Sequence, residues 1–304
     1  MTDNQLFADR KIECGNVDSK NEHAVLVSLV VCTRNRAPFL PQHLVALAAI
    51  KSEILWDIIF VDNNSSDDTA SLLAQFAQQS TVQVSIVHEK IAGLSNARNA
   101  GWRHSKAKII AFTDDDCYPS SDFVTNLAQA FSEKNIGFTG GRVLLHDPND
   151  LPMTIKLSED FDYHNAYSFI GPGYIHGANF AFTKQLLDEL GGFDPLMGSG
   201  TPYPCEDCDI LLRALNTGVR GKYCPNIVVS HHHRRRTVND LAKIDASYLA
   251  GRGAFYMKAL VDMPKPLRTA KFWYDSAKNY GFNAFVKEFF VGISYLKARR
   301  KQKI

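Results

Sequence analysis

Residues 108–119 read KIIAFTDDDCYP, an apolar run that stops at three consecutive aspartates, Asp114, Asp115 and Asp116. Three adjacent carboxylates repel one another, and burying them without a partner is very costly. Such a cluster at a strand end is therefore either solvated in a turn or bound to a cation, and hard oxygen ligands of this kind suit Mg²⁺ or Mn²⁺. In an extended segment the side chains of Asp114 and Asp116 point the same way, while Asp115 points elsewhere. We therefore expect Asp114 and Asp116 to address one site.

Short apolar runs and helical patterns alternate around the triplet. Residues 25–31, 56–61, 82–88 and 108–113 have the composition of strands, and helical patterns occupy residues 41–51, 66–79 and 95–104 between them. Ser66 or Asp67 is the expected N-cap of the second helix. This alternation predicts βαβ units, and therefore an α/β fold whose central sheet is mostly parallel and flanked by helices.

Polar residues follow three strands of this predicted sheet. Thr33 and Arg34 come after the first strand, Asp62 and Asn63 after the second, and the aspartate triplet after the fourth. Ligands of such sheets bind beyond the carboxyl ends of the strands, so we expect a binding site at this edge. Asp62 adds a further acceptor to an edge that is already acidic, and a bound metal ion would supply the balancing charge.

The alternation continues to about residue 236 and then gives way to a helical region. We expect a helix at 120–131, a strand at 137–145, an irregular aromatic segment at 147–173, a helix at 184–190, a glycine- and proline-rich loop at 191–204, a helix at 206–216 and a strand at 222–229. The predicted organisation is a polar segment at 1–24, one domain at 25–236 with halves 25–119 and 120–236, and a helical extension at 237–304.

Composition narrows the class of protein. The chain has 304 residues, 45% of them hydrophobic, and a formal net charge of +2, whereas a nucleic-acid binder concentrates more positive charge. We expect no nucleic-acid partner. Residues 1–24 are polar rather than a signal peptide, and no stretch approaches the roughly 20 apolar residues of a spanning helix. The six cysteines are then expected to be free thiols in a reducing cytosol, which predicts a cytoplasmic protein.

Seven motifs resemble, in order and spacing, the family 2 glycosyltransferases. VSLVVCTRNR, IIFVDNNSSDDT, GLSNARNAG and IIAFTDDDCYP resemble the nucleotide-binding half of that family, within residues 25–119, and GANFAFTKQLLDELGGFDPLMGSG, PCEDCDILLRALNTG and YCPNIVVSH resemble its acceptor half, within residues 120–236. The resemblance covers about residues 26–233. It implies a GT-A type fold, a Rossmann-like sheet with the donor site at its switch point.

The resemblance also implies roles for residues on the donor side. Thr33 and Arg34 match the turn after the first strand that touches the nucleotide. Asp62, with Asn63 beside it, matches the acid that bonds the base. Arg98 in the motif GLSNARNAG matches a basic residue near the nucleotide.

The aspartate triplet matches the family's metal-and-ribose motif. Asp116 is the expected metal ligand, and Asp114 is the expected ribose or second metal contact. Asp115 is expected beside the donor, as a bystander or as support for its neighbours. His231 matches a position that often completes the metal site. The implied cofactor is therefore a divalent metal ion, Mn²⁺ or Mg²⁺.

On the acceptor side, Asp207 matches the catalytic base of the family, and Glu206 stays open as an alternative base. Asn179 is a weaker acceptor-site candidate. A carboxylate is the right group because the acceptor hydroxyl is a poor nucleophile and must lose its proton. A helix that begins at Glu206 would keep the Asp207 carboxylate ionised through its dipole. The alternative is a purely structural role, in which Asp207 only caps the N-terminus of that helix.

The function that the resemblance implies is inverting transfer of a sugar from a nucleoside-diphosphate donor to a hydroxyl group. Family frequency favours UDP, and the expected acceptor is a glycan or a lipid-linked polysaccharide precursor. One alternative is a nucleotidyltransferase of the related nucleotide-sugar fold, but the segment Cys32–Arg36 lacks the glycines of a triphosphate loop. Another is a non-catalytic carbohydrate- or nucleotide-binding module, which the combination of Asp116 and Asp207 disfavours.

Three further features leave alternatives open. Cys205 and Cys208, with Cys224 and the histidines at 231–233, offer the ligand types of a structural zinc site, although a second C-x-x-C motif is absent. His232 and His233 are expected in a solvated turn, and the arginines at 234–236 are expected to reach a diphosphate or a lipid phosphate. The segment 282–304 is either an interfacial helix with a basic end that makes peripheral contact with the cytoplasmic face of a membrane, or a helix packed on the domain.

Overall fold

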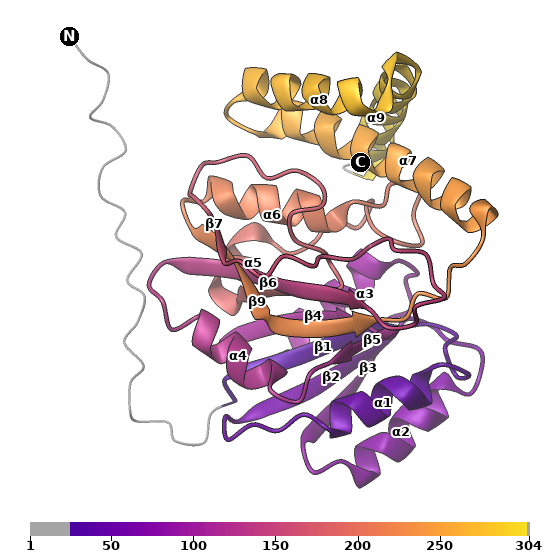
Figure 1. Ribbon diagram of the computed structural model, residues 1–304, viewed down its shortest axis with the longest axis vertical. Coiled ribbons are helices and arrows are strands. Elements are labelled where there is room, and N and C mark those ends of the chain that lie inside the picture. Colours follow the sequence, from indigo (N-terminus) through magenta and orange to yellow (C-terminus); the bar gives the residue numbers. More distant parts are fainter. Residues whose placement is uncertain (1–24, 303–304) are drawn as a thin grey trace.

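The computed structural model describes residues 25–302, so the predicted polar segment 1–24 and residues 303–304 lie outside the described part. A nine-stranded sheet runs through the molecule in the order β3-β2-β1-β4-β8-β6-β9-β5, with β7 paired to β9 (Figure 1). The strands are β1 Val27–Thr33, β2 Trp56–Asp62, β3 Gln83–His88, β4 Ile109–Asp114, β5 Cys117–Pro119, β6 Ile136–Leu145, β7 Asp162–His164, β8 Asn179–Thr183 and β9 Arg220–His231. The predicted α/β class is confirmed.

The first four strands are parallel and bring their polar ends to one edge. In the register of the sheet Thr33 lies beside Asp62, and Cys32 lies beside Asp114. β1 and β2 are buried over nearly their whole length because they have neighbours on both sides and helices on both faces. The predicted convergence of the segments after these strands is therefore confirmed by the backbone pairing.

The other half of the sheet is mixed, which departs from the mostly parallel arrangement that we expected. β8 is antiparallel to β4 and β6, and β5 and β7 are antiparallel to β9. β5 and β7 have three residues each, too few for a periodic pattern to reveal them. β5 has a consequence for the site, because its pairing places Cys117 opposite His231 at the end of β9.

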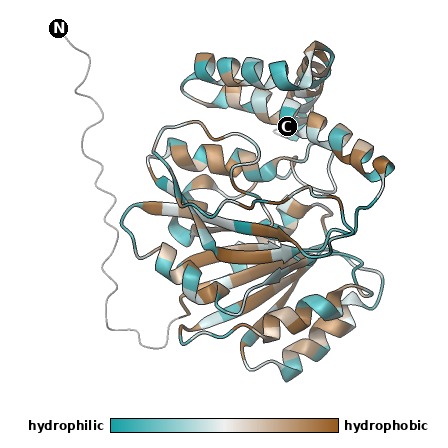
Figure 2. Ribbon diagram, viewed as in Figure 1, coloured by the Kyte–Doolittle hydropathy of each residue, from teal (hydrophilic) through white to brown (hydrophobic). Residues whose placement is uncertain are grey.

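Helices cover both faces of the sheet and divide the core into two layers. α1 Leu40–Ala48, α2 Thr69–Gln79 and α4 Phe123–Ala130 pack on one face, and α3 Leu94–His104, α5 Lys184–Leu190 and α6 Glu206–Asn216 pack on the other. Figure 2 shows the hydrophobic strands between these layers. The predicted N-cap of α2 is wrong, because Asp68 precedes the first turn. Asp67 nevertheless accepts the Thr69 N–H at 3.1 Å, so it still satisfies an open donor of that turn.

Three helices follow the sheet, in the region where the sequence indicates helices. They are α7 Val238–Asp262, α8 Pro266–Tyr280 and α9 Phe282–Gln302, and Figure 1 shows them stacked beyond α6. α9 crosses α7 where two glycines meet: a Cβ on Gly253 would overlap the Glu288 carbonyl, and one on Gly292 would lie 2.6 Å from the Met257 Cβ. α9 is thus packed on the protein. Within residues 25–302, no helix combines the length and the apolar character needed to cross a membrane.

We predict that Gly253→Ala loosens the crossing of α7 and α9. The new methyl group meets backbone atoms of Glu288, which cannot rotate away, so the free energy of unfolding should fall by about 1–3 kcal/mol. Urea unfolding followed by circular dichroism measures the change. Gly171→Ala is the matched control because its nearest neighbouring atom would lie 3.8 Å away. Equal midpoints for the two variants would show that the crossing is not tight.

Candidate active site

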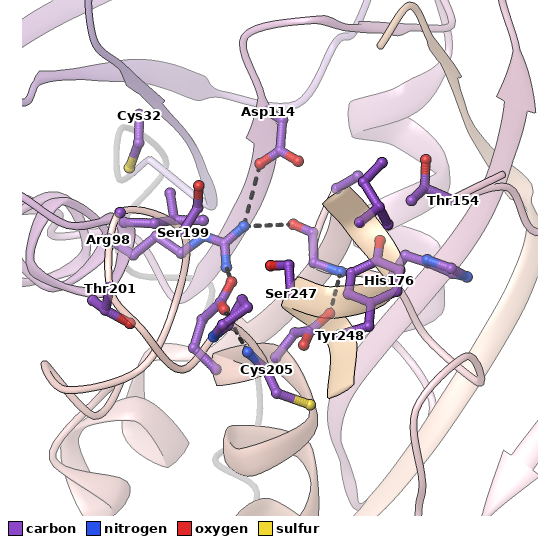
Figure 3. Close-up of a pocket in the computed structure, with 18 of the residues that line it drawn as sticks. Cys32, Arg98, Asp114, Thr154, His176, Ser199, Thr201, Cys205, Ser247 and Tyr248 are labelled. Carbon is purple, nitrogen blue, oxygen red and sulfur yellow. Dashed lines mark hydrogen bonds and ion pairs between the residues drawn. The ribbon is translucent and has the colours of Figure 1, made fainter. Parts of the chain in front are cut away.

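A cavity of about 730 Å³ opens at the carboxyl ends of β1 and β4, within the size range of small-molecule sites (Figure 3). Strand ends, α3, the start of α6 and α7 all contribute to its wall. Ten of the twelve residues singled out from the sequence line it: Thr33, Arg34, Asn63, Arg98, Asp114, Asp115, Asp116, Glu206, Asp207 and His231.

Asp62 and Asn179 do not line the cavity. Asp62 is 4% exposed, and its carboxylate accepts the Ser65 N–H at 3.0 Å in the turn after β2. The Asn179 side chain donates to the carbonyl oxygens of Arg142 and Ile227, at 2.8 and 2.9 Å, and so ties β8 to neighbouring strands. Both side chains hold the backbone that surrounds the cavity.

Arg98, on α3, is the most connected side chain of the cavity. Its guanidinium donates to Glu206 Oε1 at 2.7 Å, to the Gly177 carbonyl at 2.9 Å and to Asp114 Oδ1 at 3.2 Å, the last of which can be followed in Figure 3. Arg98 is 2% exposed, and its guanidinium lies 5.0 Å from the Phe180 ring centroid. The sequence predicted a nucleotide contact here. The structure shows a cation that joins the end of β4 to the start of α6.

Burial and Arg98 act in opposite directions on the two acids that it contacts. Burial raises the pKa of Glu206 and that of Asp114, because it disfavours the charged form, and Arg98 counteracts both shifts. On Arg98 itself, burial acts to lower the pKa, but Glu206 and Asp114 raise it above the ordinary value. The charge on Arg98 thus stabilises the charged forms of Glu206 and Asp114, and their charges stabilise the charged form of Arg98.

Glu206 and Asp207 are neighbours with different surroundings. Glu206 is 7% exposed and its carboxylate is engaged by Arg98. Asp207 accepts the Gly177 N–H at 3.1 Å and the Cys208 N–H at 2.8 Å, and within residues 25–302 it forms no ion pair. Both acids lie in the first turn of α6, where the helix dipole stabilises negative charge. Asp207 is the carboxylate that remains available for chemistry in the cavity.

Asp116 and His231 meet at the other side of the triplet, with 3.4 Å between Asp116 Oδ1 and His231 Nε2. The pairing of β5 with β9 creates this approach. Burial acts to raise the pKa of Asp116, but the hydrogen bond and charge of His231, with the charge of Arg36, lower it to about 2. On His231, burial acts to lower the pKa, and Asp116 raises it above the ordinary value. Asp114 is not in this group, because it turns to Arg98.

Asp115 is an ion-pair partner rather than a bystander. Arg36 Nε donates to Asp115 at 2.9 Å, and Arg36 Nη2 donates to Asp116 at 3.1 Å. Burial raises the pKa of Asp115 to about 6, and Arg36 opposes that shift. Our sequence analysis missed Arg36, although it stands in the motif VSLVVCTRNR. It neutralises part of the charge of the triplet.

The residues at this point of the cavity fit a divalent metal ion. Asp116 and His231 present oxygen and nitrogen ligands to one spot, and His231 Nδ1 lies 3.2 Å from Thr154 Oγ1, which fixes the ring with Nε2 toward Asp116. Cys117 Sγ is also close, but burial raises the pKa of that thiol well above its ordinary value, so it is not the thiolate that a metal prefers.

Comparison with known proteins now places the chain. Residues 28–191, more than half of it, match the family model described as "Glycosyl transferase family 2". The chain belongs to that family. It is 25% identical over 228 residues to the pre-mycofactocin glycosyltransferase of Mycobacterium tuberculosis, and the aligned region covers 71% of this chain and 45% of that relative. It is 24% identical over 220 residues to the O-antigen chain rhamnosyltransferase RfbN of Salmonella typhimurium, covering 68% of this chain and 66% of that one. The chain thus spans about half the length of the first of these relatives.

Solved structures share the fold of this family 2 member. The mannosyltransferase PcManGT from Pyrobaculum calidifontis, in complex with GDP-Man and Mn²⁺, has a TM-score of 0.57 at 16% identity, over 89% of this chain and 86% of that one. TarS of S. aureus in complex with UDP-GlcNAc has a TM-score of 0.59 at 14% identity, over 80% of this chain and 69% of that one. At such identities the likeness concerns the fold, which agrees with the predicted GT-A type.

The run 231–236 is more ordered than the solvated turn that we expected for its histidines. His233 is 8% exposed, and its Nε2 lies 3.0 Å from the Leu151 carbonyl oxygen, so the prediction is wrong for it. Arg236 is held by ion pairs with Asp147 and Asp150, away from the cavity. Arg235 is the arginine of this run that lines the cavity.

The cysteines do not assemble the zinc site considered above. Cys205 and Cys208 are close to each other and to Asp207, but the group that they form within the described part of the chain includes neither Cys224 nor a histidine. Cys224 lies on β9, where Thr139 Oγ1 is 3.5 Å from its Sγ.

Our sequence analysis also missed one wall of the cavity, because it lies beyond the family resemblance. This wall consists of the α7 residues Ile244, Ser247, Tyr248 and Arg252 together with Tyr280 at the end of α8. Residues 237–304 contain no motif from which a contribution to the cavity could be predicted.

We predict that Arg98→Met destabilises the fold in a pH-dependent way. Removing the cation leaves the buried Glu206 and the partly exposed Asp114 without it, and the expected loss, mostly from Glu206, is about 3–5 kcal/mol near neutral pH. Their pKa values, already raised by burial, should rise further. The folded state then binds more protons than the unfolded state, so stability falls as pH rises between the unfolded and the folded pKa values.

Urea unfolding at about pH 5 and about pH 8 checks this sign, with the smaller loss expected at the lower pH. Arg103→Met, on the exposed side of the same helix, is the control. A loss that is the same at both pH values would contradict the assignment.

Proposed function

We propose that this chain is an inverting glycosyltransferase, which moves a sugar from a nucleoside-diphosphate donor to a hydroxyl group of a glycan or lipid-linked acceptor. One observation carries the proposal: a single cavity brings the unpaired carboxylate of Asp207 together with the Asp116 and His231 pair. These groups come from α6, the turn after β4 and the end of β9. Displacement of a diphosphate by a hydroxyl group requires a base that removes the hydroxyl proton and a site that stabilises the negative charge of the leaving diphosphate, and both would lie in this cavity.

Asp207 is the proposed general base. Two backbone N–H groups orient its carboxylate, and no cation within residues 25–302 is paired with it. It takes the proton of the acceptor hydroxyl as that oxygen bonds to the anomeric carbon, and the bond from that carbon to the diphosphate breaks in the same displacement. Glu206 is disfavoured as the base because Arg98 already occupies its carboxylate at 2.7 Å.

Asp116 and His231 are the proposed protein ligands of a divalent metal ion, Mn²⁺ or Mg²⁺. When bound, such an ion neutralises negative charge that develops on the leaving diphosphate. Arg36 and Thr154 hold the two ligands in place, through the contacts described above. The Mn²⁺ in the PcManGT complex supports this part of the proposal.

Two arginine side chains at the cavity wall, unpaired within residues 25–302, are suited to bind the leaving diphosphate. The side chains of Arg34 and Arg235 have neither an ion pair nor a hydrogen bond within the described part of the chain, and both line the cavity. An arginine can bond a phosphate through two N–H groups at once. We therefore assign them to the donor diphosphate. UDP is the first nucleotide to test, since TarS binds UDP-GlcNAc, and GDP is the second, since PcManGT binds GDP-Man.

The decisive experiment is Asp207→Asn, assayed with a panel of UDP- and GDP-sugars and Mn²⁺ or Mg²⁺. Loss of the base should lower sugar transfer by about 10²–10⁴-fold. Nucleotide binding, measured by thermal shift, should persist because Asp207 is assigned no donor contact. Transfer that survives unchanged in this variant would contradict the role of Asp207.

Two controls separate the roles of the neighbouring acids in this assay. Glu206→Gln should lower the midpoint of unfolding because it weakens a buried ion pair with Arg98. Asp116→Asn should remove the metal-dependent part of the nucleotide thermal shift. A metal response that is unchanged in Asp116→Asn would show that the ion binds elsewhere.

Peripheral contact with a membrane follows if the acceptor is lipid-linked. The last turn of α9 carries Arg299, Arg300 and Lys301, and Phe290 on the same helix is 64% exposed. Basic and aromatic side chains suit a surface of anionic lipid. We expect the protein to sediment with phosphatidylglycerol vesicles at low salt and less so at high salt. Failure to sediment at low salt would remove the membrane contact while leaving the transfer reaction untouched.

A further inference from the structure

One face of α7 forms a wall of the cavity, although this helix lies beyond the residues that match the family model. Ile244, Ser247 and Tyr248 have the spacing i, i+3 and i+4, which places them on one face of a helix, and Gly251 and Arg252 continue that face by another turn. In the view of Figure 3, Ser247 and Tyr248 lie on the other side of the Arg98 guanidinium from Cys32 at the end of β1, and all four residues line the cavity. The wall therefore lies away from the turn after β1, where we assign the nucleotide.

A glycine contact sets the distance between this wall and the proposed base. A Cβ on Gly251 would overlap the Pro204 carbonyl oxygen and would lie 3.2 Å from the Cys205 Cβ. Backbone at Gly251 thus touches the segment that leads directly into α6, where Asp207 is the second residue. Tyr248 precedes Gly251 by three residues, which is about 4.5 Å along the helix axis. This contact seats the helix so that its preceding turn, with Ser247 and Tyr248, lines the same cavity as Asp207.

Two buried polar networks keep α7 in that position. Arg252 Nε donates to Glu288 Oε1 at 2.7 Å, and Trp273 Nε1 donates to Glu288 Oε2 at 2.7 Å, which joins α7, α8 and α9. Lys258 Nζ lies 2.7 Å from Asp194 and 2.9 Å from Asp209, which joins α7 to α6 and to the loop before it. The wall is therefore fixed by Arg252, which continues its face, and by Lys258 further along the same helix, as a preformed binding surface should be.

The wall has the chemistry of a saccharide site. The side chain of Tyr248 is 42% exposed, so a ligand can reach it, and Tyr280 adds a second ring whose face covers Arg252 at 3.8 Å. Partial burial raises the pKa of Tyr248 to about 12, with Arg235 opposing and Asp207 adding to the shift, and all three residues line the same cavity. An aromatic face binds the C–H face of a sugar ring, and hydroxyl groups at its edge satisfy polar substituents.

We propose that Ile244, Ser247 and Tyr248 form the acceptor subsite, in which a pyranose ring stacks on Tyr248 and directs one of its hydroxyl groups to Asp207. This inference rests on the proposed function, because it needs Asp207 as the base. It assigns the choice of acceptor to the C-terminal helices rather than to the part of the chain that matches the family.

The test uses the full chain and two separate readouts. Titration calorimetry with UDP and with GDP, each with Mn²⁺, reports on the donor site. Saturation-transfer NMR with a panel of methyl hexopyranosides and methyl 6-deoxyhexopyranosides, with the nucleotide and Mg²⁺, reports on the acceptor site. Tyr248→Ala should weaken glycoside binding roughly ten-fold or more, while the nucleotide dissociation constant stays unchanged.

Two further variants distinguish stacking from a general effect of the substitution. Tyr248→Phe keeps the ring and should bind the glycoside within about two-fold of wild type. Tyr274→Ala removes a tyrosine that is 61% exposed on α8 and does not line the cavity, and it should change neither readout. Thermal unfolding of each variant confirms that the helices remain folded.

Three results would overturn the subsite. The first is binding of nucleotide but of none of the glycosides by wild type, and the second is unchanged glycoside binding by Tyr248→Ala. The third is loss of nucleotide binding in Tyr248→Ala, which would place Tyr248 in the donor site. Failure of the proposed function is a different result, in which neither UDP nor GDP binds to wild type.

Discussion

The buried guanidinium of Arg98 connects the parts of this protein that have to act together. Its three acceptors belong to the end of β4, the segment before β8 and the start of α6, which lie far apart in the chain. The buried cation needs the Glu206 and Asp114 carboxylates, and the buried Glu206 in turn needs the cation, because it cannot be hydrated in the interior. The constraint positions Glu206 by direct contact. It also positions Asp207 indirectly, since Gly177 binds both the Arg98 guanidinium and the Asp207 carboxylate.

The aspartate triplet illustrates how one charged segment is divided among different partners. Asp114 turns to Arg98, Asp115 to Arg36, and Asp116 to both Arg36 and His231. Alternation along an extended chain predicts two directions, but three are realised, because the chain turns between β4 and β5 at this point. The partial neutralisation leaves Asp116 as the member with a histidine beside it, and that pair is the one suited to a metal ion.

The C-terminal helices complete the cavity rather than merely follow the sheet domain. Asp209 on α6 and Lys258 on α7 form an ion pair at 2.9 Å, and Tyr295 on α9 donates to Asp194 at 2.6 Å. Close contacts at Gly251 and Gly253 bring α7 against its neighbours on two sides. The family model matches residues 28–191, which include β1 to β4, whereas the α7 wall lies beyond them, as our proposal for the choice of acceptor requires.

Local pattern was sufficient for the strands β1 to β4, for α5 and α6, and for the residues at the strand ends, because hydrophobic periodicity and strand direction act over short stretches of chain. The order of the motifs was sufficient for the family. The partners of the charged side chains depended on the tertiary structure. Arg98 meets Glu206 across 108 residues, and Asp116 meets His231 only because a three-residue strand pairs with β9. Contacts of that kind arise from the packing of distant segments and leave no periodic trace in the sequence, and for the same reason the α7 wall became visible only in the folded molecule.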